Sequence, residues 1–205
     1  MQEAKDNKLI LLFMDASHFV MGCDFLGNIY GKTRRFVKTF SGRFRYNVLG
    51  ALDFVTKKVI TVTNDTYITA QEVCEMLRKI KAEYQGKTIH IVLDNARYQK
   101  CEIVTALAKE IDITLEYLPS YSPNLSLIER LWKHVKSKLR SKFYNQFEEF
   151  KETINAIIYD TSKSSKGVIN KLIGDAVQLF DTLFPINENT YAIKETDIDK
   201  TKDVA

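Results

Sequence analysis

Two short apolar runs, each followed by an aspartate, constrain the fold of this sequence most strongly. The first run covers residues 9–14 and is followed by Asp15, and the second covers residues 88–93 and is followed by Asp94. Continuous apolar runs of this length are typical of central strands that are buried on both faces of a sheet. A chain with two such strands needs covering layers on both faces, which favours a layered α/β fold.

The remaining segments supply the other strands and the helices. Residues 43–53 and 59–63 read as two strands joined by a short turn, and they predict a hairpin. A capping-box pattern at Thr69 and Glu72 begins a helix over residues 69–85. Further helices are expected at residues 99–111, from the break at 119–123 through about 141, at 147–159 and at 167–184, with a fifth strand at 113–118. This order predicts a ribonuclease H-like (retroviral integrase-like) mixed five-stranded sheet flanked by helices, with additional C-terminal helices.

The length of the chain limits the number of domains. With 205 residues, of which 45% are hydrophobic and 27% charged, the sequence is expected to form one soluble core over residues 1–186. Residues 187–205 carry five acids and three lysines and are predicted to form a polar, flexible tail. No apolar run reaches the ~18 residues of a membrane span, and the first residues lack the apolar centre of a signal peptide. We therefore expect a cytoplasmic protein.

Basic residues are concentrated in two segments that contain no acid. Six lie between residues 26 and 46 and six between residues 130 and 142, although the net charge of the whole chain is only +4. Such a run is as often a solvated face as a binding surface, so neither segment alone identifies a polyanionic partner. The first segment contains Lys32, Arg34, Arg35, Lys38, Arg43 and Arg45.

Asp15 and Asp94 are expected to lie close together. Ligand sites of open α/β sheets form beyond the carboxyl ends of the central strands, where both aspartates are predicted to lie. Two carboxylates at such a distance require a cation, and Mg²⁺ is the hard ion that prefers oxygen ligands. Each aspartate taken alone could instead be a turn or cap residue at the end of a strand. The pair together favours the metal site.

Glu129 is the third candidate carboxylate. Ser126 and Glu129 also have capping-box spacing, so the glutamate could bond back to the start of its helix, and the two roles could coexist. Helical spacing places Lys133, Lys136 and Arg140 on the same stripe as Glu129. Pairing of Glu129 with Lys133 would explain only the first of these bases. The stripe could follow a polyanion away from a metal site.

Four segments carry a resemblance to a known family. They are residues 13–19, 92–96, 118–125 and 128–132, with 34 residues between Asp94 and Glu129. Taken in this order, they resemble the catalytic domain of insertion-sequence transposases of the IS-six-thirty and mariner superfamily, whose active site is an Asp-Asp-Glu triad. The resemblance covers about residues 8–142.

The sequence departs from that family pattern at positions near the triad. Ala16 stands where many relatives have Glu, Gln99 where many have His, and Ser126-Leu127 where many have Asn-Pro. These departures concern contacts around the triad and the start of a helix, and all three carboxylates are retained.

The resemblance implies two-metal phosphoryl transfer with two Mg²⁺ ions per active site, for which Mn²⁺ can substitute. It implies that Asp15 bridges both ions and that Asp94 and Glu129 each hold one. Asn95 is expected to support these ligands, although an Asn after a strand is commonly a turn former. Trp132 lies on the apolar stripe of its helix and is expected to pack in the core.

DNA is the partner that the resemblance implies, at both transposon ends and target. Lys133, Lys136 and Arg140, together with Lys32, Arg34 and Arg35, are expected to contact phosphates, so affinity should fall steeply with salt. By analogy we expect a homodimer on DNA. Because Asp15 lies so near the start of the sequence, the helix-turn-helix DNA-binding segment that usually precedes such a catalytic domain is expected to be missing. The chain is then either the second frame of a split transposase, with that segment in a subunit encoded upstream, or a truncated derivative. Two alternatives remain open: a non-catalytic DNA-binding remnant, and another nuclease of the same fold, such as a ribonuclease H or junction resolvase.

Overall fold

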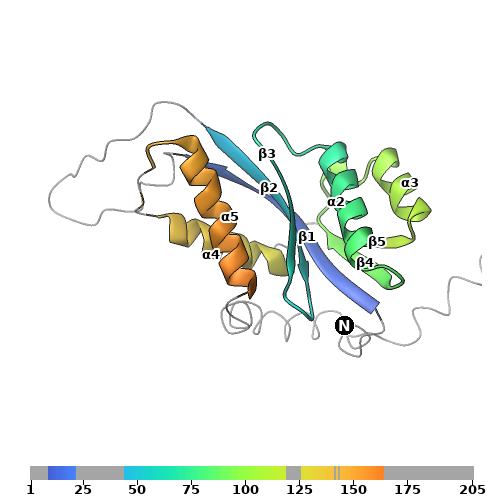
Figure 1. The fold of residues 1–205 in the computed structure, drawn as a ribbon. Coiled ribbons are helices and arrows are strands. Elements are labelled where there is room, and N and C mark those ends of the chain that lie inside the picture. Colours follow the sequence, from blue (N-terminus) through green and yellow to red (C-terminus); the bar gives the residue numbers. More distant parts are fainter. Residues whose placement is uncertain (1–8, 22–43, 119–125, 141, 143, 164–205) are drawn as a thin grey trace, which may run out of the picture.

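Five strands form one mixed sheet in the order β3-β2-β1-β4-β5 (Figure 1). The computed structural model describes residues 9–21, 44–118, 126–140, 142 and 144–163. The strands are β1 (Leu9–Val20), β2 (Arg45–Asp53), β3 (Val59–Asn64), β4 (Thr88–Leu93) and β5 (Ile113–Tyr117). β1, β2 and β3 pair antiparallel, whereas β4 pairs parallel with both β1 and β5. The predicted hairpin and the predicted mixed ribonuclease H-like sheet are confirmed.

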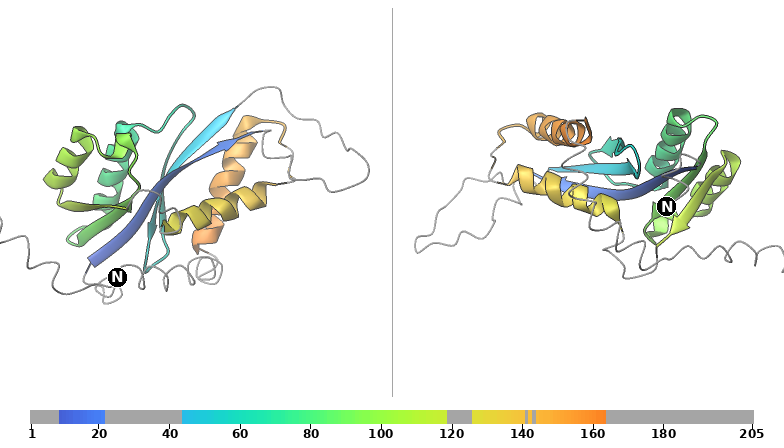
Figure 2. Two further views of the ribbon diagram at one scale, coloured as in Figure 1. Left: turned by 180° about the vertical axis from the view of Figure 1, so that it is seen from behind. Right: turned by 90° about the horizontal axis from the view of Figure 1, so that it is seen from below.

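Helices cover both faces of the sheet (Figures 1 and 2). The described helices are α2 (Ala70–Glu83), the short 3₁₀ helix η1 (Arg97–Gln99), α3 (Glu102–Glu110), α4 (Leu127–Leu139) and α5 (Phe147–Lys163). The helix predicted at residues 99–111 begins later than expected, because η1 occupies its first residues and Cys101 is its N-cap. The helix predicted at 167–184, the domain end at 186 and the tail at 187–205 lie outside the described residues. No helix in the described part of the chain could cross a membrane.

The start of α2 shows how directly the sequence specifies this helix. The Glu72 carboxylate accepts a hydrogen bond from the Thr69 backbone N–H at 2.7 Å, and the Thr69 hydroxyl accepts one from the Gln71 N–H at 3.2 Å. These bonds form the predicted capping box and satisfy amides that the helix itself leaves unpaired. The capped helix then buries the apolar face that the sequence spacing predicted, which includes Val73, Met76, Leu77 and Ile80.

The two faces of the sheet have different cores. The face under α2 and α3 is mainly aliphatic, and its fully buried residues include Leu12, Leu49, Leu77, Ile80, Ile89 and Ile91. The face under α4 and α5 is rich in aromatic residues, which include Phe13, Phe19, Tyr46, Phe54, Trp132, Tyr144 and Phe150. Alternation along β1 sends odd-numbered side chains to the aromatic face and even-numbered ones to the aliphatic face.

β1 is longer than the sequence predicts. It continues beyond Asp15 to Val20, so the prediction that Asp15 ends its strand is wrong. The parallel pairing with β4 does end near this point, at Phe13 and Val92, while the antiparallel pairing with β2 continues to Val20. The long β2 therefore keeps β1 extended after β4 has ended. Asp15 lies where the edge of β1 that faced β4 has lost its neighbour.

Candidate active site

Asp15 is half-buried on the face of the sheet that α4 covers. Odd-numbered side chains of β1 share one face, so Asp15 lies on the same face as Phe13 and Phe19, whose rings belong to the aromatic core. Burial is the largest cause that raises the pKa of this carboxyl from 3.8 to about 7, and the negative charge of Asp94 is the next. The charge of Glu129 adds to the effect. No positively charged side chain among the described residues contributes to this pKa, so none of them compensates the ionised form of Asp15.

Asp94 immediately follows β4 and is exposed. Its Oδ1 accepts a hydrogen bond from the Ala96 N–H at 3.0 Å, which is the turn role that the alternative interpretation predicted. Its charge nevertheless raises the pKa values of Asp15, Tyr98 and Glu129, in each case after the effect of burial. Asp94 thus shapes the turn and also faces the other two carboxyl groups.

Glu129 lies in the first turn of α4 and is half-buried. Burial raises its pKa and so does the charge of Asp94, whereas the Lys133 ammonium lowers it. Ser126 is the N-cap of α4, but its side chain makes no capping hydrogen bond. The capping box of the alternative interpretation is therefore not formed. The carboxylate of Glu129 remains available for a role toward the other two acids.

The structure brings the three predicted carboxylates into one electrostatic cluster. Asp94 and Glu129 are close enough for their charges to raise the pKa of Asp15, and the charge of Asp94 also raises that of Glu129. Among the described residues, however, no three His, Cys, Asp or Glu side chains are arranged so that they could hold one metal ion. All donor atoms of the cluster are hard oxygens, and like charges crowd the most buried member. A divalent cation would relieve that repulsion, so the chemistry of this donor set fits Mg²⁺ or Mn²⁺.

Trp132 and Gly50 flank Asp15, and sequence reasoning missed the glycine. Gly50 is the register partner of Asp15 in the β1–β2 ladder. A Cβ at Gly50 would lie only 2.6 Å from Cη2 and 2.7 Å from Cζ2 of Trp132, so the indole rests on bare backbone. The ring also meets Phe19 edge to face and is 4% exposed, which confirms the predicted core packing. An alternating strand pattern does not mark a glycine for such a contact.

The buried indole N–H of Trp132 is an unusual feature beside a carboxyl group. Within the described residues it has no partner that meets hydrogen-bond geometry. It lies near enough to the Asp15 carboxyl to lower the pKa of that group by a small amount, against the larger effect of burial. An ionised Asp15 would therefore have one nearby donor that no other described group uses.

Asn95 fixes the end of β4 relative to β5. Its side-chain amide donates a hydrogen bond to the carbonyl of Leu118, and the Leu118 N–H donates one to the carbonyl of Leu93 at 2.9 Å. These bonds hold the turn that carries Asp94. The contact of Asn95 is therefore with the strand ends, which agrees with the turn-forming alternative for this residue.

The bases of the predicted stripe follow Glu129 along α4. Lys133 is exposed one turn after Glu129, and the Lys136 ammonium lies 5.7 Å from the centre of the Phe19 ring. α4 ends at Leu139 and Arg140 is its C-cap, whose N–H still donates a hydrogen bond to the Lys136 carbonyl at 3.3 Å. The role of Arg140 on this stripe stays a prediction. The other predicted contacts, Lys32, Arg34 and Arg35, lie outside the described residues.

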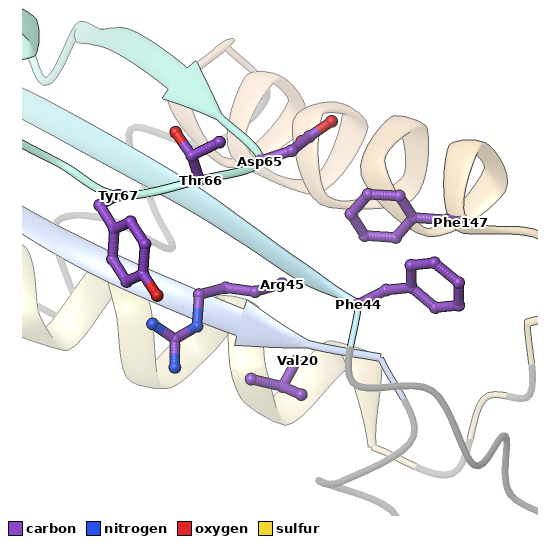
Figure 3. Close-up of a pocket in the computed structure, with 7 residues that line it drawn as sticks. All are labelled: Val20, Phe44, Arg45, Asp65, Thr66, Tyr67 and Phe147. Atoms are coloured by element: carbon purple, nitrogen blue, oxygen red, sulfur yellow. The ribbon is translucent and has the colours of Figure 1, made fainter.

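A pocket lies at the C-terminal end of β1, next to Val20 (Figure 3). This sheet-end pocket has a volume of about 620 Å³ and includes none of the three carboxylates. Its lining residues are Val20, Phe44, Arg45, Asp65, Thr66, Tyr67 and Phe147. The carboxylate cluster and the pocket are therefore separate regions, and only the cluster has the chemistry of a metal site.

Comparison with known families and structures identifies relatives of this fold. The family described as DDE superfamily endonuclease matches residues 11–151. The Mos1 mariner paired-end complex with Mn is similar with a TM-score of 0.60 and 11% identity, over 84% of this chain and 55% of that chain. The Mos1 transposase paired-end complex with the left transposon end gives 0.55 and 10%, over 81% and 55%. No curated protein sequence matched.

A chain of the simian T-cell lymphotropic virus intasome, in complex with the PP2A regulatory subunit B56 gamma, is also similar. It gives a TM-score of 0.50 and 16% identity, over 73% of this chain and 47% of that chain. At these identities the likeness shows a shared ribonuclease H-like integrase fold. The present chain spans about half the length of the chains that it matches.

Proposed function

This chain belongs to the DDE superfamily of endonucleases, and from that premise we propose that it is the catalytic domain of a DNA transposase. The proposed activity is hydrolysis of a phosphodiester at transposon ends, followed by transfer of the freed strand into target DNA. The observation that carries the proposal is the cluster of Asp15, Asp94 and Glu129, in which both other charges raise the pKa of the half-buried Asp15. A family that cleaves DNA with paired divalent ions needs such a cluster.

We propose that the cluster would hold two divalent ions, with Asp15, Asp94 and Glu129 as their ligands. When bound, such ions activate the attacking oxygen and stabilise the leaving oxygen. Asp15 must be ionised to serve as a ligand. Because its pKa is about 7, a large fraction of this carboxyl is protonated at neutral pH, so ion binding displaces a proton. Affinity for the ions is therefore expected to rise with pH up to about pH 8.

The two proposed steps use the same site in succession. In the first step a water oxygen bonds to the scissile phosphorus, the bond from phosphorus to the 3′ oxygen breaks, and that oxygen takes up a proton as the water loses one. In the second step the freed 3′-hydroxyl loses its proton as its oxygen bonds to a target phosphorus. The bond from that phosphorus to the 3′ oxygen of the target strand breaks, and this oxygen takes up a proton. Neither step requires a covalent bond to the protein, which agrees with a cluster made only of carboxylates.

Contacts to DNA phosphates are proposed for Lys133 and Lys136, which follow Glu129 along α4. Lys32, Arg34 and Arg35 are proposed to add further contacts, as is Arg140 at the end of α4. Each neutralised phosphate should steepen the loss of affinity with salt. A homodimer on paired DNA ends and an upstream helix-turn-helix subunit belong to the same proposal, and the related Mos1 structures are described as paired-end complexes.

Hydrolysis of duplex DNA tests the proposal directly. The chain, mixed with Mg²⁺ or Mn²⁺ and DNA that includes the ends of its own element, should release a 3′-hydroxyl end and join it to a second duplex. Asp94→Ala should reduce both steps by about 10³-fold or more, because several kcal/mol of charge stabilisation is lost. Asp160→Ala is the matched control, since Asp160 is an exposed acid on α5, outside the cluster.

Each other outcome contradicts the proposal in a different way. Equal activity of Asp94→Ala and the wild type would show that the cluster is not the active site. Absence of cleavage and joining, with DNA binding retained, would identify a non-catalytic DNA-binding remnant. Preferred cleavage of RNA–DNA hybrids or four-way junctions would identify another nuclease of this fold.

A further inference from the structure

The loop after β3 presents the exposed aromatic side chain of Tyr67. Buried Asn47 donates hydrogen bonds from Nδ2 to the carbonyl of Thr66 at 2.8 Å and to Oδ1 of Asn64 at 3.0 Å. The Asn64 amide in turn donates to the carbonyl of Tyr67 at 2.6 Å. Two side-chain amides therefore fix the backbone of this loop, while the Tyr67 ring is 69% exposed. A ring presented by a fixed loop loses little further conformational entropy when it stacks on a ligand.

Flat groups line the sheet-end pocket on opposite sides (Figure 3). The Arg45 guanidinium lies 5.9 Å from the centre of the Tyr67 ring. On the other side Phe44 is 47% exposed and stacks on Phe147 with ring centres 5.3 Å apart. Aromatic rings with a planar cation beside them are the groups on which proteins stack unpaired nucleobases, since every base has a π face. The volume of about 620 Å³ is ample for one base.

Asp65 is the acidic residue that lines the pocket, and its charge is neutralised by a lysine. Asp65 is paired with the Lys151 ammonium at 3.1 Å, and that ammonium also lies 5.0 Å from the centre of the Phe147 ring. Arg45, by contrast, forms no salt bridge within the described residues, and its guanidinium lies over the Tyr67 ring. The lining therefore offers a cation and flat rings to a ligand, with its carboxylate already neutralised.

Positive charge connects the pocket with the carboxylate cluster. Lys133 and Lys136 follow Glu129 along α4, and Lys136 lies over Phe19 near the end of β1. Burial lowers the pKa of His18, and the charges of Lys136 and Arg45 both lower it further, so both cations lie near this residue. By the alternation along β1, Lys136 lies on the α4 face and Arg45, the register partner of Val20, lies on the other face, so the two cations flank the edge of β1 that β4 leaves free. Along β1 the path from Asp15 to Val20 is about 17 Å, which equals the rise of about five base pairs of duplex DNA.

We propose that the sheet-end pocket is a stacking site for an unpaired base of a DNA strand, whose phosphates pass along Lys133 and Lys136 from the carboxylate cluster. The inference rests on the proposed function and adds a strand path and a base-binding position to it. Tyr67 supplies a stacking ring, and the Arg45 guanidinium, which lies over one face of that ring, supplies the cation. A base within a duplex is already stacked on its neighbours, so this pocket favours single-stranded DNA or an extrahelical base.

Binding of DNA in a metal chelator tests the stacking site without any cleavage. The probe is a fluorescein-labelled single strand, and a blunt duplex of the same sequence serves for comparison, with dissociation constants measured by fluorescence anisotropy. Tyr67→Ala should weaken binding of the single strand about tenfold and change duplex binding by less than about twofold. Tyr67→Phe retains the ring and should bind like the wild type. Tyr159→Ala, at an exposed tyrosine about 18 Å farther along α5 than Phe147, is the matched control.

The remaining outcomes decide against the stacking site. Equal binding of single strand by Tyr67→Ala and the wild type would overturn it, as would no binding by the wild type, or an equal loss for the blunt duplex. Competition by deoxyadenosine monophosphate as effective as that by the strand would assign the pocket to a free nucleotide. Cleavage is measured separately, so loss of the stacking site would leave the proposed transposase activity standing, and loss of that activity would not alter these binding results.

Discussion

The two faces of the sheet differ in the polar groups that their cores contain. Under α2 and α3 the core is aliphatic, and the helix that covers it begins with a completed capping box. Under α4 and α5 the core contains a half-buried carboxyl at Asp15 and a buried indole N–H at Trp132 without a described partner. Groups of this kind cost stability, and they occur on both sides, since both side-chain polar atoms of buried Gln99, next to α2 and α3, also lack a described partner. Only the face under α4 places them beside the candidate site.

The packing of α4 against the sheet fixes the position of a candidate site residue. The same helix buries Leu131 and Trp132 against the sheet and carries Glu129 and Lys133 on its neighbouring stripe. Packing of the aromatic core therefore sets the position of Glu129 relative to Asp15. If this comparison is right, substitutions on the two faces should separate stability from activity.

Asp15→Asn should give the largest difference between stability and activity. Removal of this ligand is expected to lower cleavage by at least about 10³-fold. The pKa of about 7 against 3.8 means that the folded state retains a proton that the unfolded state releases between about pH 4 and 7. The free energy of unfolding should therefore fall as pH rises through that range, by up to roughly 4 kcal/mol, and Asn should remove this fall.

Chemical denaturation between pH 4 and 8, in a metal chelator, measures the effect of Asp15→Asn. Asp160→Asn is the control and should retain the pH dependence of the wild type. A variant that is less stable than the wild type at pH 8 would show that the carboxyl stabilises the fold, contrary to the comparison of the faces.

Leu77→Ala and Leu131→Ala form a matched pair across the sheet. Both leucines are buried, one in α2 and the other in α4, and each truncation should cost about 3 kcal/mol of unfolding free energy. Only Leu131→Ala should also reduce cleavage per folded molecule, because it loosens the helix that carries Glu129. Urea unfolding and cleavage assays at a temperature where both variants are folded would measure the two effects. Equal activity of the pair would remove the link between α4 packing and the site.

Gly50→Ala should disturb the site by overfilling it. The added Cβ would approach the Trp132 ring to 2.6 Å, and overpacking of this kind costs about 1–3 kcal/mol. Gly86→Ala is a useful control: its φ of 69° strains an alanine by about 1–2 kcal/mol, but nothing lies within 4 Å. Cleavage should fall in Gly50→Ala and not in Gly86→Ala, despite similar midpoints of thermal unfolding. Normal cleavage by Gly50→Ala would show that the indole position does not matter.

Trp132→Phe should have the smallest effect of the four. The change removes the indole N–H but keeps an aromatic ring, with a packing loss of about 1 kcal/mol. Because that N–H lowers the pKa of Asp15, its loss should raise this pKa slightly and move the fall in stability to higher pH. Denaturation curves at several pH values measure the shift. No shift, or a shift to lower pH, would show that the indole does not act on the carboxyl.

Most elements of the fold could be predicted because their signals are local. The helix at α2 followed from its cap residues and apolar spacing, and the hairpin from alternation on either side of a turn. The end of β1 could not be predicted, since Val20 stays in the sheet through pairing with Arg45 of a distant segment. The start of α3 was misplaced because η1 occupies the residues that also fit a helical pattern.

The candidate site rests on sequence signals of the same local kind. The three carboxylates were identified from their positions after apolar runs and from the spacing between them, and the structure brings their charges together. Their catalytic roles stay a prediction. Gly50 and the sheet-end pocket had no sequence signal, because both depend on segments that meet only in the folded chain.

By itself, the sequence determined the order of strands and helices, the acids that follow the central strands and the bases that follow Glu129. These features depend on periodicity and spacing along the chain, which are local properties. The tertiary structure decided that Asp15 lies within a longer strand, that Gly50 leaves room for Trp132, and that Tyr67 and Arg45 line one pocket. These depend on register and helix packing, where residues far apart in sequence compete for the same space.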